Sequence, residues 1–245
     1  MRARSVYRIG GSDRIDFLQN LVTNDVGGLS EGLVWTAILT PQGKYLADFF
    51  LVPEDGDALL LDVDSELAPG LAQRLTMYKL RANVTIEATE IEVATGPGNA
   101  PDGAFIDPRE PALGWRAYDG RASETQDMDA LRVAHCVPAS GIELIPNETY
   151  PLEAGFERLH GVDFKKGCYV GQEVTARMKH KTELKKGFRT VEVSGSAAPG
   201  TNLVTEDGKA AGTLFTQSGG QGIAYLRFDR AEGPMSAGDA IVRLP

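Results

Sequence analysis

The chain has 245 residues, of which 42% are apolar and 24% are charged, and its formal net charge is −9. This composition is typical of a soluble globular protein, and no apolar run is long enough to cross a membrane. The two cysteines, Cys136 and Cys168, lack CxxC spacing, which indicates a reducing compartment. Residues 1–13 contain no apolar core of a secretory signal and are too few for an intact transit peptide. We therefore expect a cytoplasmic protein without a membrane partner.

The first third of the chain predicts one helix and three strands. Ser12 or Asp13 can cap a helix over roughly residues 13–22, which the turn-forming residues after it bring to an end. Apolar runs separated by short turns then favour an antiparallel meander. Its three expected strands are Leu33–Thr40, Lys44–Val52 and Ala58–Asp64.

The middle of the chain mixes helical and strand patterns. Residues 66–79 predict a helix, because leucines recur at helical spacing and Pro69 stands in the first turn. Residues 123–126 have the form of a capping box, which predicts a helix from there to about residue 135. The other expected elements are strands over 83–88 and 90–95, a Gly/Pro loop over 96–103, and short helices over 151–159 and 171–178.

From residue 185 onward, helical patterns are absent and short β runs alternate with Gly-rich turns. This pattern predicts a small antiparallel barrel or sandwich, with residues 219–222 as a hairpin loop. We therefore expect an α+β protein with a first domain over residues 1–182 and a β-barrel-like domain over 183–245. The β runs of the second domain are Phe188–Val193, Ala211–Thr216, Ile223–Arg227 and Ala240–Leu244.

Positive charge is concentrated in Lys165–Lys186, which we call the basic segment. It holds seven Lys or Arg against two Glu, a net charge of about +5 on a chain of −9. Such a segment is suited to meet an anion. Cys168 follows two lysines directly, and nearby cations favour the reactive thiolate. On charge alone, a solvated basic turn around a small buried thiol remains the alternative.

Residues 166–173 read Lys-Gly-Cys-Tyr-Val-Gly-Gln-Glu. This octet resembles the K-G-C-[FY]-x-G-Q-E signature of the YgfZ-type folate-binding proteins. That family includes mitochondrial iron–sulfur assembly factors and is related to T-protein, the aminomethyltransferase of glycine cleavage. Residues 11–25, 37–51 and 78–84 also resemble blocks of the family, so the similarity extends over most of residues 5–185. It implies the aminomethyltransferase folate-binding fold, with antiparallel sheets and flanking helices.

The resemblance also implies a tetrahydrofolate in a central cavity, with Cys168 at its mouth as nucleophile, redox thiol or transient ligand. Asp48 and Glu148 would hold the pterin ring, since a carboxylate suits its donor edge. Arg81 would bind the glutamate tail of the folate or pair with a helix C-terminus, and the tail would be drawn toward the basic segment. The other candidate binding residues, all in the octet, are Lys166, Gly167, Tyr169, Gly171, Gln172 and Glu173.

For several of these residues, the sequence is also consistent with a purely structural role. Asp48 lies among apolar neighbours, where a carboxylate is costly to bury without a partner, and could instead be an exposed acid at a strand end. Glu148 could be a solvated loop acid. Arg132, on the helix expected to end near residue 135, is expected at the surface. The three histidines and two cysteines form no metal-ligand pattern, so no metal ligands are assigned.

The function that the resemblance implies is that of a tetrahydrofolate-binding accessory factor for assembly or repair of iron–sulfur clusters. Its partners would be the assembly machinery or client enzymes, because two cysteines cannot supply a four-thiolate cluster site.

A folate-dependent aminomethyltransferase is the first alternative. Those enzymes usually carry two acids where this chain has Ala47-Asp48, which argues against it and leaves enzymatic turnover open. An RNA-binding factor is the second alternative. One compact basic segment with a single aromatic residue is weak support for RNA binding.

Overall fold

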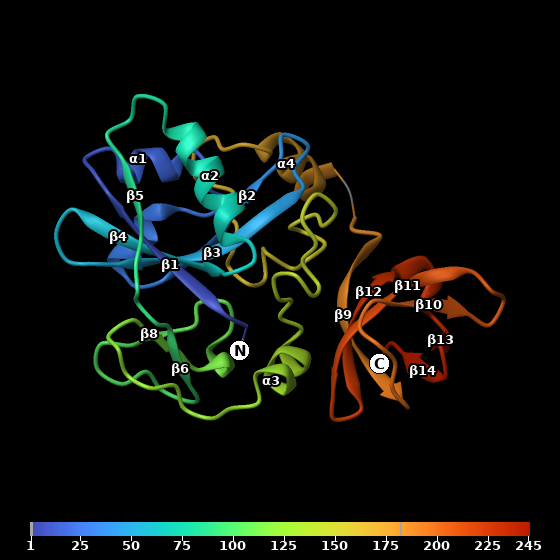
Figure 1. The fold of residues 1–245 in the computed structure, drawn as a ribbon. Coiled ribbons are helices and arrows are strands. Elements are labelled where there is room, and N and C mark those ends of the chain that lie inside the picture. The colour runs from blue at the N-terminus through green and yellow to red at the C-terminus, as the bar shows by residue number, and fades with distance from the viewer. Residues whose placement is uncertain (1, 182) are drawn as a thin grey trace.

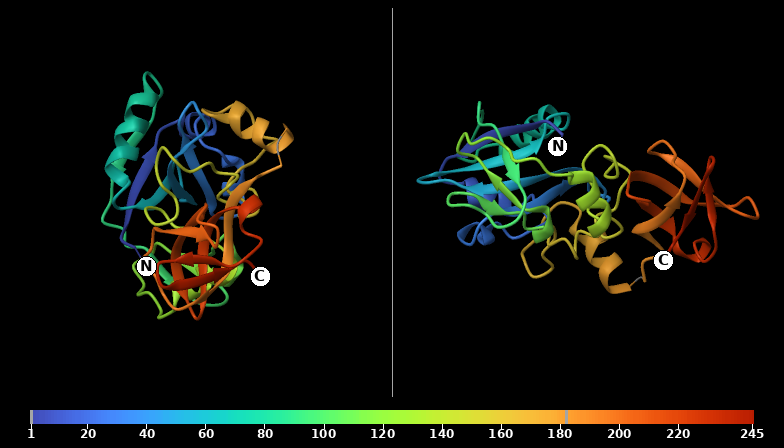
Figure 2. Two further views of the ribbon diagram at one scale, coloured as in Figure 1. Left: turned by 90° about the vertical axis from the view of Figure 1, so that its right-hand side faces the viewer. Right: turned by 90° about the horizontal axis from the view of Figure 1, so that it is seen from below.

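The computed structural model describes residues 2–181 and 183–245. It consists of an α+β domain followed by a β-barrel, and the barrel lies at one end of an elongated molecule (Figures 1 and 2). The α+β fold class with a C-terminal barrel is thereby confirmed. The expected domain boundary between residues 182 and 183 involves residue 182, which lies outside the described residues.

A five-stranded antiparallel sheet forms the centre of the first domain, in the order β2-β3-β4-β1-β5. The predicted meander is present as its first three strands, and β1, which the sequence analysis did not identify, lies between β4 and β5. The strands are β1 (Arg4–Gly10), β2 (Val34–Leu39), β3 (Tyr45–Pro53), β4 (Ala58–Asp64) and β5 (Thr85–Ala88).

Both faces of this sheet are covered, which explains why β2 and β3 are almost entirely apolar. One face packs on α1 (Arg14–Gln19) and α2 (Ala68–Lys79), through residues such as Leu18, Leu71 and Leu75. The other face packs on segments between residues 113 and 169 and on the barrel. Side chains alternate between faces, so the two neighbours Ala47 and Asp48 lie on opposite sides of the sheet.

Two predicted helices start or end elsewhere than expected. The helix expected over 13–22 is only α1, because Asn20 ends it with its side-chain amide on the carbonyl of Asp16. The helix expected from residue 123 is α3 (Met128–His135), whose N-cap is Asp127, which accepts the backbone N–H of Ala130. Ser123 cannot cap it, since its hydroxyl accepts the backbone N–H of Thr95.

Other elements of the middle region also differ from expectation. Residues 151–159 form successive turns and not a helix, with Gly155 at a φ of +76°. In the run expected as a strand over 90–95, only the last two residues join one. A small sheet in the order β6-β8-β7 stands there instead. Its strands are β6 (Ala94–Gly96), β7 (Phe105–Ile106) and β8 (Trp115–Ala117), and the 3-10 helix η2 (Pro111–Leu113) lies between β7 and β8. Another 3-10 helix, η1 (Val26–Ser30), precedes β2.

Beyond α4 (Gln172–Lys181), which confirms the helix expected near residue 171, six strands close into a barrel in the order β10-β11-β12-β9-β14-β13. The glycines at 219 and 220 form the predicted hairpin turn, both at positive φ. The strands are β9 (Lys186–Ser194), β10 (Thr201–Thr205), β11 (Ala210–Ser218), β12 (Gln221–Arg227), β13 (Met235–Ala237) and β14 (Ala240–Arg243), with η3 (Phe228–Arg230) after β12.

The barrel is joined to the first domain by polar contacts, one buried and one partly buried. Glu143 accepts the hydroxyl of Thr216 on β11 at 2.6 Å, and Glu153 accepts that of Tyr225 on β12 at 2.6 Å. Among the helices of residues 2–181 and 183–245, none combines the length and apolarity needed to span a bilayer.

Candidate functional site

Cys168 lies on an exposed loop before α4 and has a free thiol. The loop is fixed by Lys166, which is 8% exposed. Its ammonium donates to the backbone carbonyls of Gln19 (2.7 Å), Val22 (2.6 Å) and Asn24 (3.0 Å). Lys166 therefore serves as an internal anchor, and it is not available to bind a ligand.

Burial lowers the pKa of Lys166 to about 8, while Asp25 and Asp163 act in the opposite direction. The ammonium also lies 5.3 Å from the centre of the Tyr169 ring, which is itself buried in the core beneath the sheet. Burial accordingly raises the pKa of Tyr169. The lysine and tyrosine of the octet thus hold the loop that presents Cys168 to solvent.

The glycines of the octet differ in what they permit. Gly171 has a φ of +87°, and a Cβ there would lie 2.7 Å from the carbonyl oxygen of Thr40. It therefore lets the start of α4 pack against the turn between β2 and β3. Gly167 is exposed, with open space where a side chain would be. Gln172 donates to the Gly167 carbonyl at 3.4 Å.

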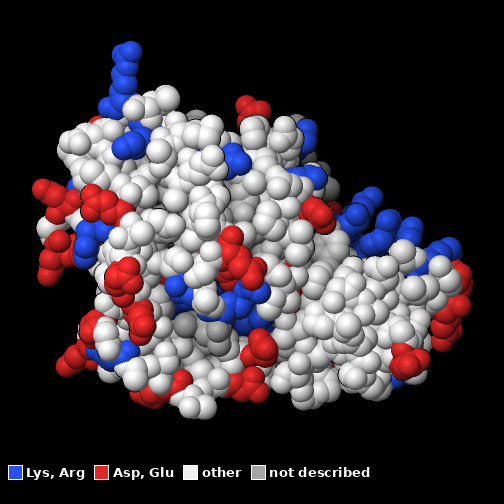
Figure 3. All heavy atoms as spheres, viewed as in Figure 1, with Lys and Arg blue, Asp and Glu red and all other residues white. Residues whose placement is uncertain are grey.

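The basic segment is spread over α4 and the start of β9. Of its charged groups, Lys165, Glu173 and Arg177 are exposed, Lys179 pairs with Glu157, and the side chain of Lys181 lies outside the described residues. Figure 3 shows Lys and Arg side chains gathered where the first domain meets the barrel. The thiol of Cys168 is exposed, close in the chain to the buried Lys166 and the exposed Lys165.

Asp48 lines a separate cavity of about 540 Å³. The carboxylate is 3% exposed and accepts three hydrogen bonds from neutral groups: Trp35 Nε1 at 2.9 Å, the Tyr45 hydroxyl at 2.7 Å and the Ser140 hydroxyl at 2.6 Å. These contacts exclude the alternative of an exposed acid at a strand end. Burial, followed by the Asp48 charge, raises the pKa of Tyr45 well above its ordinary value, so its phenol stays a donor.

Arginines line the same cavity, and none of them was expected there from the sequence. Arg132 was expected at the surface. It is instead 6% exposed and donates to Glu143 at 2.6 Å and to Thr216 at 3.1 Å. Near the centre of the face of the molecule seen in Figure 3, Lys and Arg side chains gather with Asp and Glu side chains around them. The cavity arginines are Arg2, Arg4, Arg109, Arg116 and Arg132.

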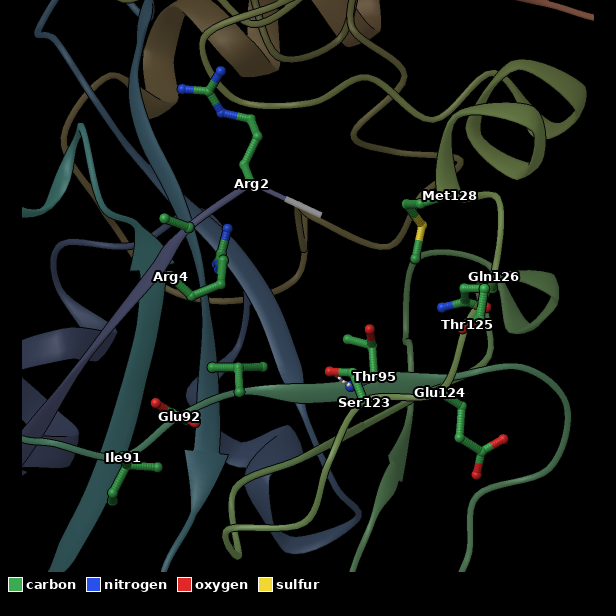
Figure 4. A pocket seen from close by; sticks show the side chains of 12 residues that line it. Arg2, Arg4, Ile91, Glu92, Thr95, Ser123, Glu124, Thr125, Gln126 and Met128 are labelled. Atoms are coloured by element: carbon green, nitrogen blue, oxygen red, sulfur yellow. Dashed lines mark hydrogen bonds between the residues drawn. The ribbon is translucent and has the colours of Figure 1, made fainter.

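A second hollow of about 500 Å³ adjoins this cavity, sharing Arg2, Arg4, Gln126 and Met128 with it. In Figure 4, Arg2 and Arg4 stand on one side, Gln126 and Met128 on the other, and Thr95 and Ser123 lie below. The Oε1 atom of Gln126 is buried without a hydrogen-bond partner among the described residues. The space beside Asp48 therefore extends along the N-terminal strand.

The structure does not bring the other predicted site residues to this cavity. No octet residue is among those that line it, and α4 and α3 lie at opposite ends of the first domain (Figure 1). Glu148 is exposed in a turn, and Arg81 is exposed after α2. The expected arrangement, with Cys168 at the mouth and the ligand tail on the basic segment, is therefore corrected to two separate sites.

A signal for the missed arginines was present in the sequence. Arg2 and Arg4 stand two residues apart just before and at the start of β1, and Asp62 and Asp64 alternate along the apolar strand β4. Alternate residues share a face, so opposite charges on two strands predict ion pairs between them. The structure pairs Arg2 with Asp64 and Arg4 with Asp62, both at 2.6 Å.

Comparison with known proteins identifies the family to which this chain belongs. Residues 185–245 match the family model described as the CAF17 C-terminal beta-barrel domain. The chain is 30% identical over 278 residues to the mitochondrial iron-sulfur cluster assembly factor IBA57 of Mus musculus, covering 95% of this chain and 78% of that protein. The chain belongs to the IBA57 family of iron–sulfur cluster assembly factors.

Two further comparisons concern another relative and a solved structure. The chain is 32% identical over 216 residues to a mitochondrial IBA57 homolog of Mycosarcoma maydis, covering 75% of this chain but only 54% of that relative, so it spans about half its length. The aminomethyltransferase T of the glycine cleavage system from Bartonella henselae superposes with a TM-score of 0.72 at 12% identity, over 98% of this chain and 81% of the other. This second likeness shows the expected fold and nothing about activity.

The expectation of a cytoplasmic protein is wrong, because the named relatives of Mycosarcoma maydis, Mus musculus and Homo sapiens are mitochondrial. Two unpaired cysteines indicate a reducing compartment, and that chemistry does not tell one reducing compartment from another.

Proposed function

We propose that this chain assists the assembly of iron–sulfur clusters in other proteins, with Cys168 as its working group. The observation that carries the proposal is the exposed thiol on a loop anchored by Lys166, in a member of a family of assembly factors. Iron–sulfur clusters are ligated by cysteine thiolates, and this chain has only two cysteines. Cys168 would therefore ligate the iron of a cluster transiently, while a partner protein supplies the other ligands.

The cavity beside Asp48 is proposed to bind a tetrahydrofolate. Its volume suits a small molecule, and its lining combines charged and polar groups with the apolar side chains of Met128 and Ile142. The Oδ2 atom of Asp48 keeps acceptor capacity, since it receives only the Trp35 N–H, whereas Oδ1 already accepts the hydroxyls of Tyr45 and Ser140. Asp48 would accept a hydrogen bond from a ring nitrogen of the folate, while Trp35, Tyr45 and Ser140 hold the carboxylate in place.

Restoration of a [4Fe–4S] enzyme in cells from which the gene has been deleted tests the role of the thiol. The parent chain and Cys136→Ser should restore the activity of the enzyme per unit of its protein, whereas Cys168→Ser should not. Cys136 is the matched control because it is the other free cysteine and is largely buried. Full restoration by Cys168→Ser would show that the thiol has no part in the function.

Calorimetric titration with 5-formyltetrahydrofolate tests the cavity. We expect binding to the parent, a loss of about tenfold or more in affinity for Asp48→Asn, and no change for Glu148→Ala, which lies outside the cavity. No binding to the parent, or equal binding to the parent and Asp48→Asn, would contradict a folate held by Asp48.

Aminomethyl transfer remains a second candidate because of the position of Asp48. Position 47 faces the core on the α1 and α2 side of the sheet, so an acid there would not face the cavity. The alanine at 47 therefore does not remove a carboxylate from the site, which corrects the argument drawn from the Ala47-Asp48 pair. Release of methylenetetrahydrofolate from aminomethylated lipoyl carrier protein in the presence of tetrahydrofolate would establish this activity.

A further inference from the structure

Three arginines of the Asp48 cavity surround one aromatic ring. The guanidinium carbons of Arg116, Arg109 and Arg4 lie 4.1, 4.9 and 5.8 Å from the centre of the Phe50 ring on β3. Arg109 also lies 5.7 Å from the ring of Trp35. Aromatic packing fixes these planar groups, so that only their edges remain to meet other partners.

Part of each edge is held by a buried carboxylate. Asp107 accepts Nε and Nη2 of Arg109 and Nε of Arg116. Asp62 accepts Nη1 of Arg116 and Nε of Arg4. Both carboxylates are buried, and the arginines lower the pKa of Asp107 against the effect of its burial. The three guanidinium groups are therefore held in place before any ligand arrives.

One terminal nitrogen of each arginine has no hydrogen bond among the described residues: Nη1 of Arg4, Nη1 of Arg109 and Nη2 of Arg116. The buried unpartnered side-chain atoms of the described residues do not include them. These three nitrogens therefore reach the open space, and all three arginines line the cavity.

The charges favour an anion at this position. The three arginines carry three positive charges, and Asp62 and Asp107 carry two negative charges, so the cluster keeps one positive charge. Asp48 lies in the same cavity but receives its hydrogen bonds only from neutral groups. A ligand with an oxyanion at the arginines and a hydrogen-bond donor at Asp48 would match both groups.

We propose that Arg4, Arg109 and Arg116 form an oxyanion subsite that takes a carboxylate or phosphate group of the cavity ligand. The proposal rests on the proposed function of the Asp48 cavity and specifies how its ligand lies. For a folate, a carboxylate of the glutamate tail binds inside this cavity and not on the basic segment around Cys168. Asp127 and Asp129 also line the cavity, and their charges disfavour a polyanion such as RNA.

Calorimetry with fragments of the ligand tests the subsite in Arg109→Lys, which keeps the charge but loses the planar fork. The probe p-aminobenzoyl-glutamate carries the carboxylates without the pterin, and 6-methyltetrahydropterin carries the ring without them. We expect the affinity for the first probe to fall about tenfold to a hundredfold, and the affinity for the second to change less than twofold.

Arg121→Lys is the matched control. Arg121 pairs with Asp119 two residues earlier and lies 5.7 Å from the ring of Trp115. Arg109 likewise pairs with Asp107 two residues earlier and packs on Phe50. Unlike Arg109, Arg121 lies outside the cavity. It should leave both affinities unchanged. Equal losses for the two probes in Arg109→Lys would show general damage to the cavity and overturn the subsite.

Two other outcomes separate the subsite from the folate proposal. If 5-formyltetrahydrofolate binds the parent and Arg109→Lys equally, the subsite is wrong while folate binding stands. If no folate or fragment binds but inorganic phosphate does, and Arg109→Lys weakens it at least tenfold, the subsite stands and its natural ligand is a phosphate. If neither phosphate nor the fragments bind the parent, the subsite is wrong.

Discussion

Replacing Glu143 by alanine removes a carboxylate that joins the first domain to the barrel. Glu143 is buried, and its Oε2 accepts Nη2 of Arg132 at 2.6 Å, while its Oε1 accepts the hydroxyl of Thr216 at 2.6 Å. Without it, the acidic partner left to the buried guanidinium of Arg132 among the described residues is Asp129, whose side chain is 63% exposed. Removing one partner of a buried ion pair costs about 3–5 kcal/mol of unfolding free energy, and we expect a loss of that size.

Urea unfolding, with Glu157→Ala as the control, measures this loss. Glu157 also pairs with one cation, Lys179, but on the surface, where such a pair contributes about 1 kcal/mol or less. The Glu143 variant should therefore unfold at a much lower urea concentration than the Glu157 variant. A loss below about 1 kcal/mol for Glu143→Ala, equal to that of the control, would refute the view that the buried Arg132 depends on Glu143 as its partner.

Two further outcomes follow from the octet. Gly171→Ala should lower the unfolding free energy by about 1–3 kcal/mol in chemical denaturation, because φ is +87° and the new Cβ would lie 2.7 Å from the Thr40 carbonyl oxygen. Gly167→Ala is the control, and because open space surrounds it the unfolding free energy should change by no more than about 0.5 kcal/mol. Equal effects of the two substitutions would contradict this. Since burial lowers the pKa of Lys166 from 10.5 to about 8, the unfolded state binds more protons between those values, and stability should rise with pH there by up to about 1.4 kcal/mol per pH unit. Unfolding of the parent and Lys166→Met across this range should differ in slope, and parallel curves would show that Lys166 keeps an ordinary pKa.

Local patterns predicted most of the fold. The meander and the barrel followed from β runs separated by turns, and the strand Ala58–Asp64 has the predicted bounds. The predicted helix ends were less accurate. Ser123 and Asp127 are both suitable N-cap residues, and Asp127 caps the helix because the Ser123 hydroxyl is already bound to the backbone N–H of Thr95. Contacts of this kind join residues far apart in the chain, and no local pattern reports them.

The same limit applies to the site. Asp48 stood out because a carboxylate within an apolar strand needs partners, and the structure supplies three. Arg132 looked like an ordinary surface charge on an amphipathic helix, since Glu143 and Thr216 are 11 and 84 residues away. The octet motif pointed to Cys168, but its spelling could not show that the loop lies away from the Asp48 cavity.

The separation of the Cys168 thiol from the Asp48 cavity is tested most directly by alkylation of Cys168 in a Cys136→Ser background. The rate is measured with and without 5-formyltetrahydrofolate at a concentration that calorimetry shows to be saturating. Because the thiol is exposed and no octet residue lines the cavity, we expect the two rates to agree within about twofold. Protection of the thiol by tenfold or more would mean that ligand and cysteine share one site, which would contradict their separation.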